Sequence, residues 1–288
     1  MTPVRTTRVN GAGGVTLVVD SWGEQTNPPV IFLHGGGQNR HSWRRTAQLV
    51  AGLGWHATAF DMRGHGDTGW PEDRQYDLAD YVADVEAVGR IMGRSAVLVG
   101  ASLGGIVALL ASTRVPSSAS ALVMVDVGLS VNPAGSQRVK SFMLRHAETG
   151  FDSLEEAAEA VAGYLDNRTR LRTPEDLRKS LVRKDGRWFW RWDPNILTSP
   201  GMSRVETGSL KQVAHQLTVP TLLIRGGLSD VLDDERVAEF IENVPHALYR
   251  MVDDATHMVS GDDNDAFNSV ICDFFEFIKP LNIIENTR

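Results

Sequence analysis

The residues best suited to covalent chemistry form the pentapeptide Gly100-Ala101-Ser102-Leu103-Gly104. This G-x-S-x-G pattern directly follows an apolar run and precedes residues with helical spacing, which predicts a sharp turn from strand to helix. Such a turn exposes the serine hydroxyl, and the helix N-terminus beside it favours a developing negative charge. We therefore interpret Ser102 as a nucleophile. The alternative is a helix-capping serine without chemistry, which would rarely need glycine on both sides.

A glycine loop with the sequence HGGG, residues 34–37, follows another apolar run. The backbone N–H groups of glycines can approach a reacting carbonyl closely and stabilise an oxyanion. We expect the N–H groups of Gly36 and Leu103 to be the two donors, with Gly37 as the alternative to Gly36. His34 is interpreted as a structural histidine that holds this loop. A phosphate-binding loop is excluded because no Lys-Ser/Thr pair follows the glycines.

A serine nucleophile needs a base that removes its proton and an acid that orients the base. With a G-x-S-x-G nucleophile, the chain order is serine, acid, histidine. Of the eight histidines, His257 lies well past Ser102 and directly after an apolar strand pattern. Asp230 follows the preceding strand pattern and is expected to be the acid. Asp126, which follows an earlier strand pattern, is the alternative.

These candidate residues sit at the ends of short apolar runs that recur along the chain. The runs cover residues 30–33, 56–60, 96–99, 121–125, 221–224 and 247–252. Runs that are apolar on both faces are typical of strands buried between two helical layers, and patterns of helical spacing lie between them. The sequence therefore predicts an α/β fold with a mostly parallel central sheet flanked by helices. Residues 4–9 and 15–19 predict an antiparallel hairpin that leads into this sheet.

The alternation of strands and helices stops in the middle of the chain. Residues 129–212 show helical patterns and no convincing strand. Ser153-Leu154-Glu155-Glu156 has the form of a capping box, and Thr173-Pro174-Glu175-Asp176 places proline at a helix start. We expect a core domain formed by residues 1–128 and 213–288. Residues 129–212 would form a helical cap over the ends of the strands.

In this order, the HGGG loop, the segment Asp61-Met62-Arg63-Gly64-His65-Gly66, the G-x-S-x-G motif, Asp230 and His257 resemble the α/β-hydrolase family. The resemblance covers nearly the whole chain. The segment 61–66 is similar to one common among esterases, lactonases, cofactor-free haloperoxidases and epoxide hydrolases, where it supports loops near the site. His65 is accordingly expected to be structural. Ser102 departs from the epoxide hydrolases and haloalkane dehalogenases, which use an aspartate nucleophile.

The resemblance also implies that the cap lines an acyl pocket. Four tryptophans are candidates for substrate contacts in such a pocket: Trp43, Trp188, Trp190 and Trp192. The alternative for all four is simple packing, because buried aromatic side chains serve cores as readily as pockets.

Composition restricts the partners and the location of the chain. Its residues are 42% hydrophobic and 23% charged, and the formal net charge is −7. With this acidic balance and no Lys/Arg block, we expect no binding to nucleic acid or to anionic membranes. A single cysteine, an N-terminus without an apolar signal region and the lack of a long apolar run lead us to expect a cytoplasmic protein. No His or Cys pair has metal-ligand spacing, so neither a metal nor a cofactor is expected.

The predicted function is hydrolysis of a small-molecule substrate, a small to medium apolar carboxylic ester or lactone, through an acyl-enzyme. One alternative keeps the triad but cleaves a C–C bond in vinylogous diketones. That reaction would favour a cationic residue in the pocket, for which Arg191 and Arg204 are candidates. A second alternative is a non-catalytic ligand-binding protein of the same fold, which would have no need of an intact triad. The oligomeric state stays open.

Overall fold

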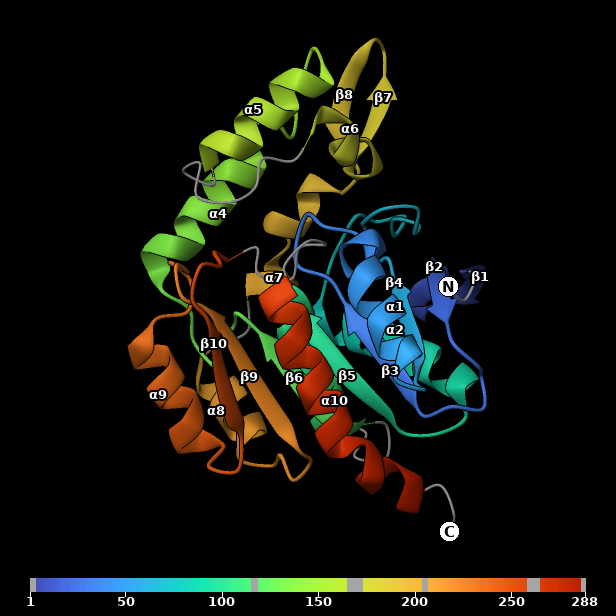
Figure 1. Ribbon diagram of the computed structural model, residues 1–288. Helices are drawn as coiled ribbons and strands as arrows, with labels where there is room; N and C mark the ends of the chain where they lie inside the picture. The colour runs from blue at the N-terminus through green and yellow to red at the C-terminus, as the bar shows by residue number, and fades with distance from the viewer. Residues whose placement is uncertain (1–3, 115–118, 165–172, 204–206, 258–264, 286–288) are drawn as a thin grey trace.

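The structure, a computed structural model, describes residues 4–114, 119–164, 173–203, 207–257 and 265–285. An eight-stranded sheet runs through its centre in the order β1-β2-β4-β3-β5-β6-β9-β10 (Figure 1). The strands are β1 (Arg5–Asn10), β2 (Thr16–Trp22), β3 (Pro29–Leu33), β4 (His56–Phe60), β5 (Ala96–Ala101), β6 (Ala119–Val125), β9 (Thr221–Gly226) and β10 (Leu248–Val252). The pairs β1–β2 and β2–β4 are antiparallel, and all other neighbours in this sheet are parallel.

Helices cover both faces of this sheet. The helices are α1 (Arg44–Gly52), α2 (Leu78–Met92), α3 (Leu103–Arg114), α4 (Pro133–Arg145), α5 (Leu154–Tyr164), α6 (Pro174–Leu177), α7 (Pro200–Ser203), α8 (Thr207–Ala214), α9 (Asp234–Asn243) and α10 (Asp265–Glu285). One hydrophobic cluster joins the sheet to α2, α3, α8 and α9. A second cluster, on the opposite face, joins it to α1 and α10. The result is the three-layer arrangement that the apolar runs predict.

The central strands are buried on both faces because helices cover each side. Every residue of β3, β5 and β9 is buried. Helix α2 shows how local sequence sets an element's bounds: the Asp77 side chain accepts the backbone N–H of Ala79 at its start, and Gly93 ends it with a φ of 70°. The predicted α/β class, its central strands and the antiparallel opening hairpin are confirmed.

Between β6 and β9 the chain leaves the sheet and forms a separate group of elements. Helices α4, α5 and α6 lie there with a hairpin of β7 (Leu181–Lys184) and β8 (Arg187–Trp190), at the top of Figure 1. Phe151, Leu154, Ala157, Leu177 and Leu181 form a small hydrophobic cluster among them. The expectation that residues 129–212 contain no strand is therefore wrong for this hairpin.

The end of this segment returns to the main core. Leu210 and Ala214 of α8 belong to the hydrophobic cluster that also contains α3. Thus α8 packs on the sheet layer, although part of it falls inside the range 129–212 expected to form the cap. The division of the chain into core and cap stays a prediction, and the elements that stand away from the sheet are α4 to β8 (Figure 1).

Backbone hydrogen bonds tie the returning chain to the loop after β4. The N–H of Gly66 donates to the carbonyl of Arg191 at 2.7 Å, and the N–H of Asp193 donates to the carbonyl of Gly64 at 2.8 Å. The buried carboxylate of Asp193 accepts the hydroxyl of Tyr76 at 2.7 Å. These bonds hold residues 191–193 against the segment 61–66 predicted to support the site.

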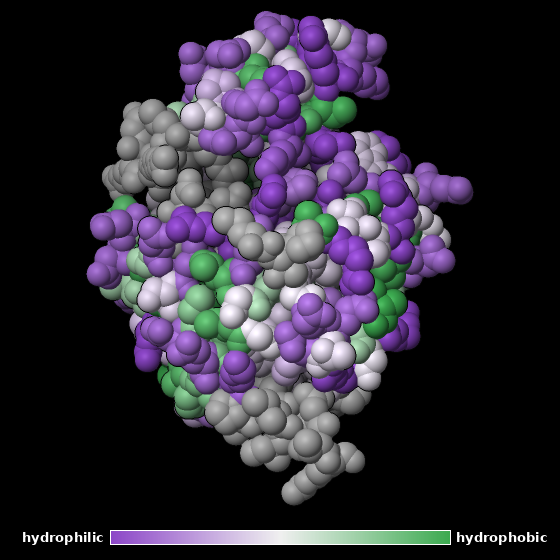
Figure 2. Space-filling model, turned by 45° about the vertical axis from the view of Figure 1, so that its right-hand side comes forward, coloured by the Kyte–Doolittle hydropathy of each residue, from purple (hydrophilic) through white to green (hydrophobic). Residues whose placement is uncertain are grey.

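On the face shown in Figure 2, hydrophilic residues dominate, and hydrophobic residues form small, separate patches. None of the described helices combines the length and the apolar character needed to cross a bilayer.

Candidate active site

Ser102 lies between β5 and α3, at the edge of the sheet where the parallel strands end. Its φ of 49° is in the left-handed region that non-glycine residues rarely adopt. Such a conformation costs about 1–3 kcal/mol and clusters at functional sites. The strain follows from the sharp turn that the G-x-S-x-G pattern predicts, and the turn lifts the side chain away from the strand.

Close contacts require glycine at three positions around Ser102, two of them against backbone and one against a side chain. A Cβ on Gly100 would lie 2.1 Å from the carbonyl oxygen of Gly104. One on Gly104 would lie 2.4 Å from the carbonyl oxygen of Leu33, and one on Gly105 would lie 2.4 Å from Cγ1 of Val127. No side chain larger than hydrogen fits where the chain doubles back so tightly.

His257 connects Ser102 to a carboxylate. The Oγ of Ser102 lies 3.2 Å from Nε2 of His257, so the hydroxyl can donate its proton to the ring. On the other side of the ring, Nδ1–H donates to Oδ2 of Asp126 at 2.7 Å. The three side chains come from the turns that follow β5, β10 and β6, which end at the same edge of the sheet. The structure thus brings Ser102 and His257 together, as expected.

The expected acid, Asp230, does not reach His257, and this part of the prediction is corrected. Its carboxylate instead pairs with Arg138 of α4 at 3.2 Å and is partly exposed. Its backbone carbonyl is packed against the start of α4, where a Cβ on Gly135 would lie 2.0 Å away. The alternative acid, Asp126, occupies the position that the prediction gave to Asp230.

Asp126 is only 1% exposed, and its φ of 52° lies in the left-handed region that non-glycine residues rarely adopt. Besides His257, its carboxylate accepts the backbone N–H of Gly226 at 2.8 Å and the hydroxyl of Ser229 at 2.5 Å. A buried carboxylate requires such partners, since an unpaired charge away from water is costly. These donors fix the plane of the carboxylate beside the imidazole.

The glycine loop after β3 faces Ser102. A Cβ on Gly35 would lie 3.5 Å from Cβ of Ser102. The N–H of Gly35 donates to the side-chain oxygen of Gln38 at 2.9 Å, and the N–H of Gly37 donates to Nε2 of His65 at 3.1 Å. Within the described part of the chain, the N–H groups of Gly36 and Leu103 have no acceptor. The predicted pair therefore has two N–H groups available, whereas that of Gly37, the alternative, is occupied.

His34 and His65 are both fully buried and hold this loop, as expected. The Nδ1–H of His34 donates to the carbonyl of Gly35 at 2.8 Å, while its Nε2 accepts the N–H of Met62 at 3.0 Å. The Nδ1–H of His65 donates to the carbonyl of Arg63 at 3.0 Å. Burial lowers the pKa of His34 to about 4. Burial, and then the neighbouring His34, lower the pKa of His65 to about 3. Both rings are neutral at pH 7.

The segment 61–66 supports the loop through buried charges as well. The Asp61 carboxylate accepts the backbone N–H of Arg40 at 2.7 Å and its guanidinium at 2.5 Å. The guanidinium of Arg63 forms two hydrogen bonds to Asp84, at 2.7 and 2.8 Å. Two-point pairing of this kind restricts rotation, so the loop after β4 is a rigid base for the glycine loop.

The four tryptophans expected near the substrate lie in different places. Trp43 is fully buried between Phe32 and Phe267 in the cluster under α10, so its prediction as a substrate contact is wrong. Trp188 and Trp190 pack against the small cluster among α4 to β8. The backbone of Trp192 forms an isolated antiparallel β-bridge with that of His65. The indole Nε1 of Trp192 would lie 3.7 Å from a Cβ on Gly37. Only Trp192 is placed beside the glycine loop.

Sequence reasoning did not single out Met143 of α4, which lies above the same loop. Its Cε would be 3.8 Å from a Cβ on Gly36 and 3.0 Å from one on Gly37. The side chain is only 8% exposed. The only sequence signal was its position on an apolar side of a helix, which is equally typical of core packing.

The cations considered for a C–C hydrolase do not face Ser102 in the described residues. Arg191 donates to Asp67 at 2.5 Å, which directs its guanidinium to the loop after β4. Arg204 lies outside the described residues. Within the described residues there is also no group of three or more His, Cys, Asp or Glu side chains that could hold a metal ion.

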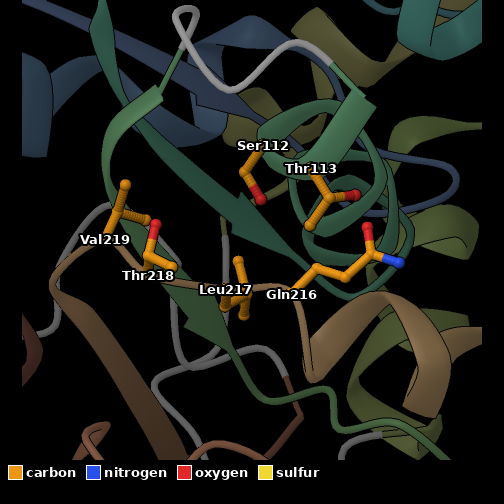
Figure 3. Close-up of a pocket in the computed structure, with 6 residues that line it drawn as sticks. All are labelled: Ser112, Thr113, Gln216, Leu217, Thr218 and Val219. Atoms are coloured by element: carbon orange, nitrogen blue, oxygen red, sulfur yellow. The ribbon is translucent and has the colours of Figure 1, made fainter.

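A cavity of about 220 Å³ lies elsewhere, between the end of α3 and residues 216–219 (Figure 3). Ser112 and Thr113 line it from the C-terminal part of α3. Ser102 precedes the other end of this helix, which at 12 residues is about 18 Å long. The cavity is therefore separate from the candidate active site.

A serine, an imidazole and a buried carboxylate at the ends of parallel strands, beside two free N–H groups, define the class of serine-nucleophile α/β proteins. The family model described as "alpha/beta hydrolase fold" matches residues 28–263, which is more than half of the chain. The chain belongs to the α/β hydrolase fold family.

Individual relatives agree with this assignment. The chain is 30% identical to the esterase Rv0045c of Mycobacterium tuberculosis over 275 residues, covering 90% of this chain and 86% of that protein. It is 26% identical to a monoacylglycerol lipase of Mycolicibacterium smegmatis, covering 75% and 76% of the two chains. Among solved structures, an E-2-(acetamidomethylene)succinate hydrolase superposes with a TM-score of 0.81 at 22% identity, covering 95% of this chain and all of the other.

Proposed function

We propose that the protein is a serine esterase that cleaves small to medium apolar carboxylic esters or lactones through an acyl-enzyme. The observation that carries the proposal is the position of His257, which lies 3.2 Å from the hydroxyl of Ser102 and 2.7 Å from the carboxylate of Asp126. The similarity to an esterase and to a lipase supports the same type of bond.

In the first half of the reaction, Oγ of Ser102 attacks the ester carbonyl while Nε2 of His257 takes its proton. The carbonyl oxygen becomes an oxyanion that accepts the N–H groups of Gly36 and Leu103. Asp126 stabilises the imidazolium through Nδ1–H. The imidazolium then protonates the leaving alcohol as the C–O bond breaks, which leaves the acyl group on Ser102. A lactone follows the same course, except that its alcohol stays attached to the acyl chain.

In the second half, His257 removes a proton from water, whose oxygen attacks the acyl carbon. The same two N–H groups bind the second oxyanion. Return of the proton to Ser102 releases the carboxylic acid. In a serine protease, removal of one side-chain donor to the oxyanion lowers kcat by about 10²–10³-fold, which indicates the scale of such a contribution.

An apolar acyl group is favoured by the side chains that surround the glycine loop. Met143 lies above Gly36 and Gly37, and Trp192 flanks the loop beside His65. Behind Met143, the ring of Phe142 stacks on Tyr164 at 4.3 Å and contacts Trp190 edge-on at 6.3 Å. Aromatic and thioether side chains pack more favourably against a hydrocarbon acyl chain than against a charged one.

The test compares the purified protein with two serine variants on p-nitrophenyl acetate and butyrate and on a small lactone. Ser102→Ala should abolish turnover and prevent labelling by a fluorophosphonate probe. Ser112→Ala, at the other end of α3, should retain both and is the matched control. Turnover that survives in Ser102→Ala would refute the proposal. A wild-type protein that neither turns over esters nor reacts with the probe would favour a ligand-binding role.

A further inference from the structure

The turn of residues 226–229, after β9, contacts both the acid and the loop that carries the base. On one side, the N–H of Gly226 and the hydroxyl of Ser229 donate to the two carboxylate oxygens of Asp126, at 2.8 and 2.5 Å. On the other side, the N–H of Leu228 donates to the carbonyl of Ala255 at 2.9 Å. Ala255 lies two residues before His257. The turn therefore sets the position of the acid relative to the base.

Close packing leaves this turn no room to move by itself. A Cβ on Gly226 would lie 2.6 Å from the carbonyl oxygens of both Ala255 and Thr256. A Cβ on Gly227 would lie 2.4 Å from the carbonyl oxygen of Asp253. Because backbone lies against backbone here, a shift of the turn would shift the loop before His257 with it.

Local hydrogen bonds fix the direction in which the Ser229 hydroxyl donates. Its Oγ lies 3.2 Å from the N–H of Val231 and 3.3 Å from the N–H of Leu232, and both groups can only donate to it. A hydroxyl has one proton to donate, and these two N–H groups cannot accept it. The proton is left for Oδ2 of Asp126, the same oxygen that accepts Nδ1–H of His257.

We propose that Ser229 is a positioning residue of the catalytic triad, which holds Asp126 in the plane of the His257 ring and reduces the basicity of its carboxylate. The inference rests on the proposed serine esterase function. A carboxylate oxygen that accepts two donors is held in orientation and shares its negative charge between them. Without the serine donor, the carboxylate rotates more freely, and its charge acts more strongly on the imidazolium.

Removal of the hydroxyl therefore has two separable effects. Poorer orientation of the ring lowers the rate, and a more basic Asp126 stabilises the protonated form of His257. The second effect favours the protonated enzyme, so the acidic limb of the pH profile moves to higher pH. Tyr164 feels the charges of Asp126, Asp230 and Arg138, and Asp230 pairs with Arg138. The loop before His257 also carries Asp253 and Asp254. None of them is changed by a substitution at 229.

The experiment measures kcat/KM against pH for the full chain with p-nitrophenyl butyrate. Ser229→Ala should lose about tenfold, the effect of one hydrogen bond to a charged group. Its acidic limb should move upward by about half a pH unit. Ser229→Thr, which keeps the donor, should recover most of the rate and the original limb.

A spectroscopic measurement gives an answer that does not depend on turnover. The Nδ1 proton of His257 should give a far-downfield proton resonance, and Ser229→Ala should change its shift and raise the pH at which it titrates. A Ser229→Ala protein with wild-type rate and wild-type titration overturns the inference. So does a loss of rate with an unmoved acidic limb, since that is the result of a merely structural serine. An inert wild-type enzyme would refute the esterase proposal, and the resonance would still decide the role of Ser229.

Discussion

At the scale of single residues, two carboxylates are candidates for the acid that orients His257. Asp126 is buried and bonded to His257, whereas Asp230 is partly exposed and paired with Arg138. A buried acid that orients the base acts on the transition state directly. A partly exposed ion pair is worth about 0–1 kcal/mol.

The two aspartates are therefore a matched pair of variants. Asp126→Asn should lower kcat by about 10⁴-fold, because the amide favours the wrong tautomer of His257. Asp230→Asn should stay within about twofold of the wild-type rate. Initial rates on p-nitrophenyl butyrate at pH 8 measure both. A severe loss in Asp230→Asn together with an active Asp126→Asn would return the acid to position 230.

Ser102, His257 and the glycine loop each have a local signature in the sequence, and the structure brings all three together at one edge of the sheet. The acid has no such signature. Strands β6 and β9 end at the same edge of the sheet. The turn after each strand carries an aspartate that lies between Ser102 and His257 in the chain. Which carboxylate meets the imidazole depends on the packing of Gly226 and Gly227 against residues 253–256, a tertiary contact that spacing does not encode.

At the scale of elements, the nucleophile turn depends on the close approach of α3 to β3. A methyl group on Gly104 would lie 2.4 Å from the carbonyl oxygen of Leu33 and 2.6 Å from that of His34. Backbone atoms of a buried strand cannot give way as a flexible side chain can. The contact that makes the turn possible is also the one that a single methyl group would break.

Two helical glycines test this dependence. Gly104→Ala should destabilise the fold by about 3 kcal/mol or more, through overpacking against backbone. Gly89→Ala in α2, where the added Cβ has no neighbour within 4 Å, should stabilise it by about 0.5–1 kcal/mol. Urea denaturation followed by circular dichroism gives both free energies of unfolding. Similar values for the two variants would contradict this account of the turn.

The central strands of the sheet, such as β3, β5 and β9, are predictable from the sequence because burial on both faces leaves continuous apolar runs. The hairpin β7–β8 was missed because it lies outside that sheet and carries charged residues such as Arg183, Lys184 and Arg187. Its turn did carry a signal. Asp185 and Gly186 have φ values of 50° and 84°, which is the two-residue turn that an Asp-Gly pair between strands favours. The position of Trp43 in the core is not predictable from the sequence, because the sequence does not show which way an aromatic side chain points.

At the scale of the whole molecule, stability should fall in mild acid because of His34 and His65. In the folded state, Nε2 of each ring accepts a backbone N–H, from Met62 and from Gly37 respectively. A protonated ring would present N–H to N–H, so both rings resist protonation. Their pKa values in the folded protein, about 4 and about 3, lie below the ordinary value of 6.5.

The direction in which stability changes with pH follows from proton binding by the folded and unfolded states. Below pH 6.5 the unfolded chain takes up protons on these histidines, and the folded chain takes them up only near its lower pKa values. Unfolding is therefore favoured as pH falls from about 6.5 towards 4, and the contribution of the two rings is fully present above that range. Each ring accounts for a loss of up to about 2 kcal/mol between pH 7 and pH 5, at 1.4 kcal/mol per unit.

A histidine replacement isolates this contribution from that of the carboxylates. His65→Gln lowers stability at pH 7, but it should reduce the loss between pH 7 and pH 5 by up to about 2 kcal/mol, because one titrating group is gone. His215→Gln, which changes an exposed histidine, should leave the loss unchanged. Urea denaturation at both pH values measures the difference. If His65→Gln lost as much stability as the wild-type protein over this range, the neutral histidine pair could not be the origin of the acid sensitivity, and the glycine loop would have to depend on other contacts.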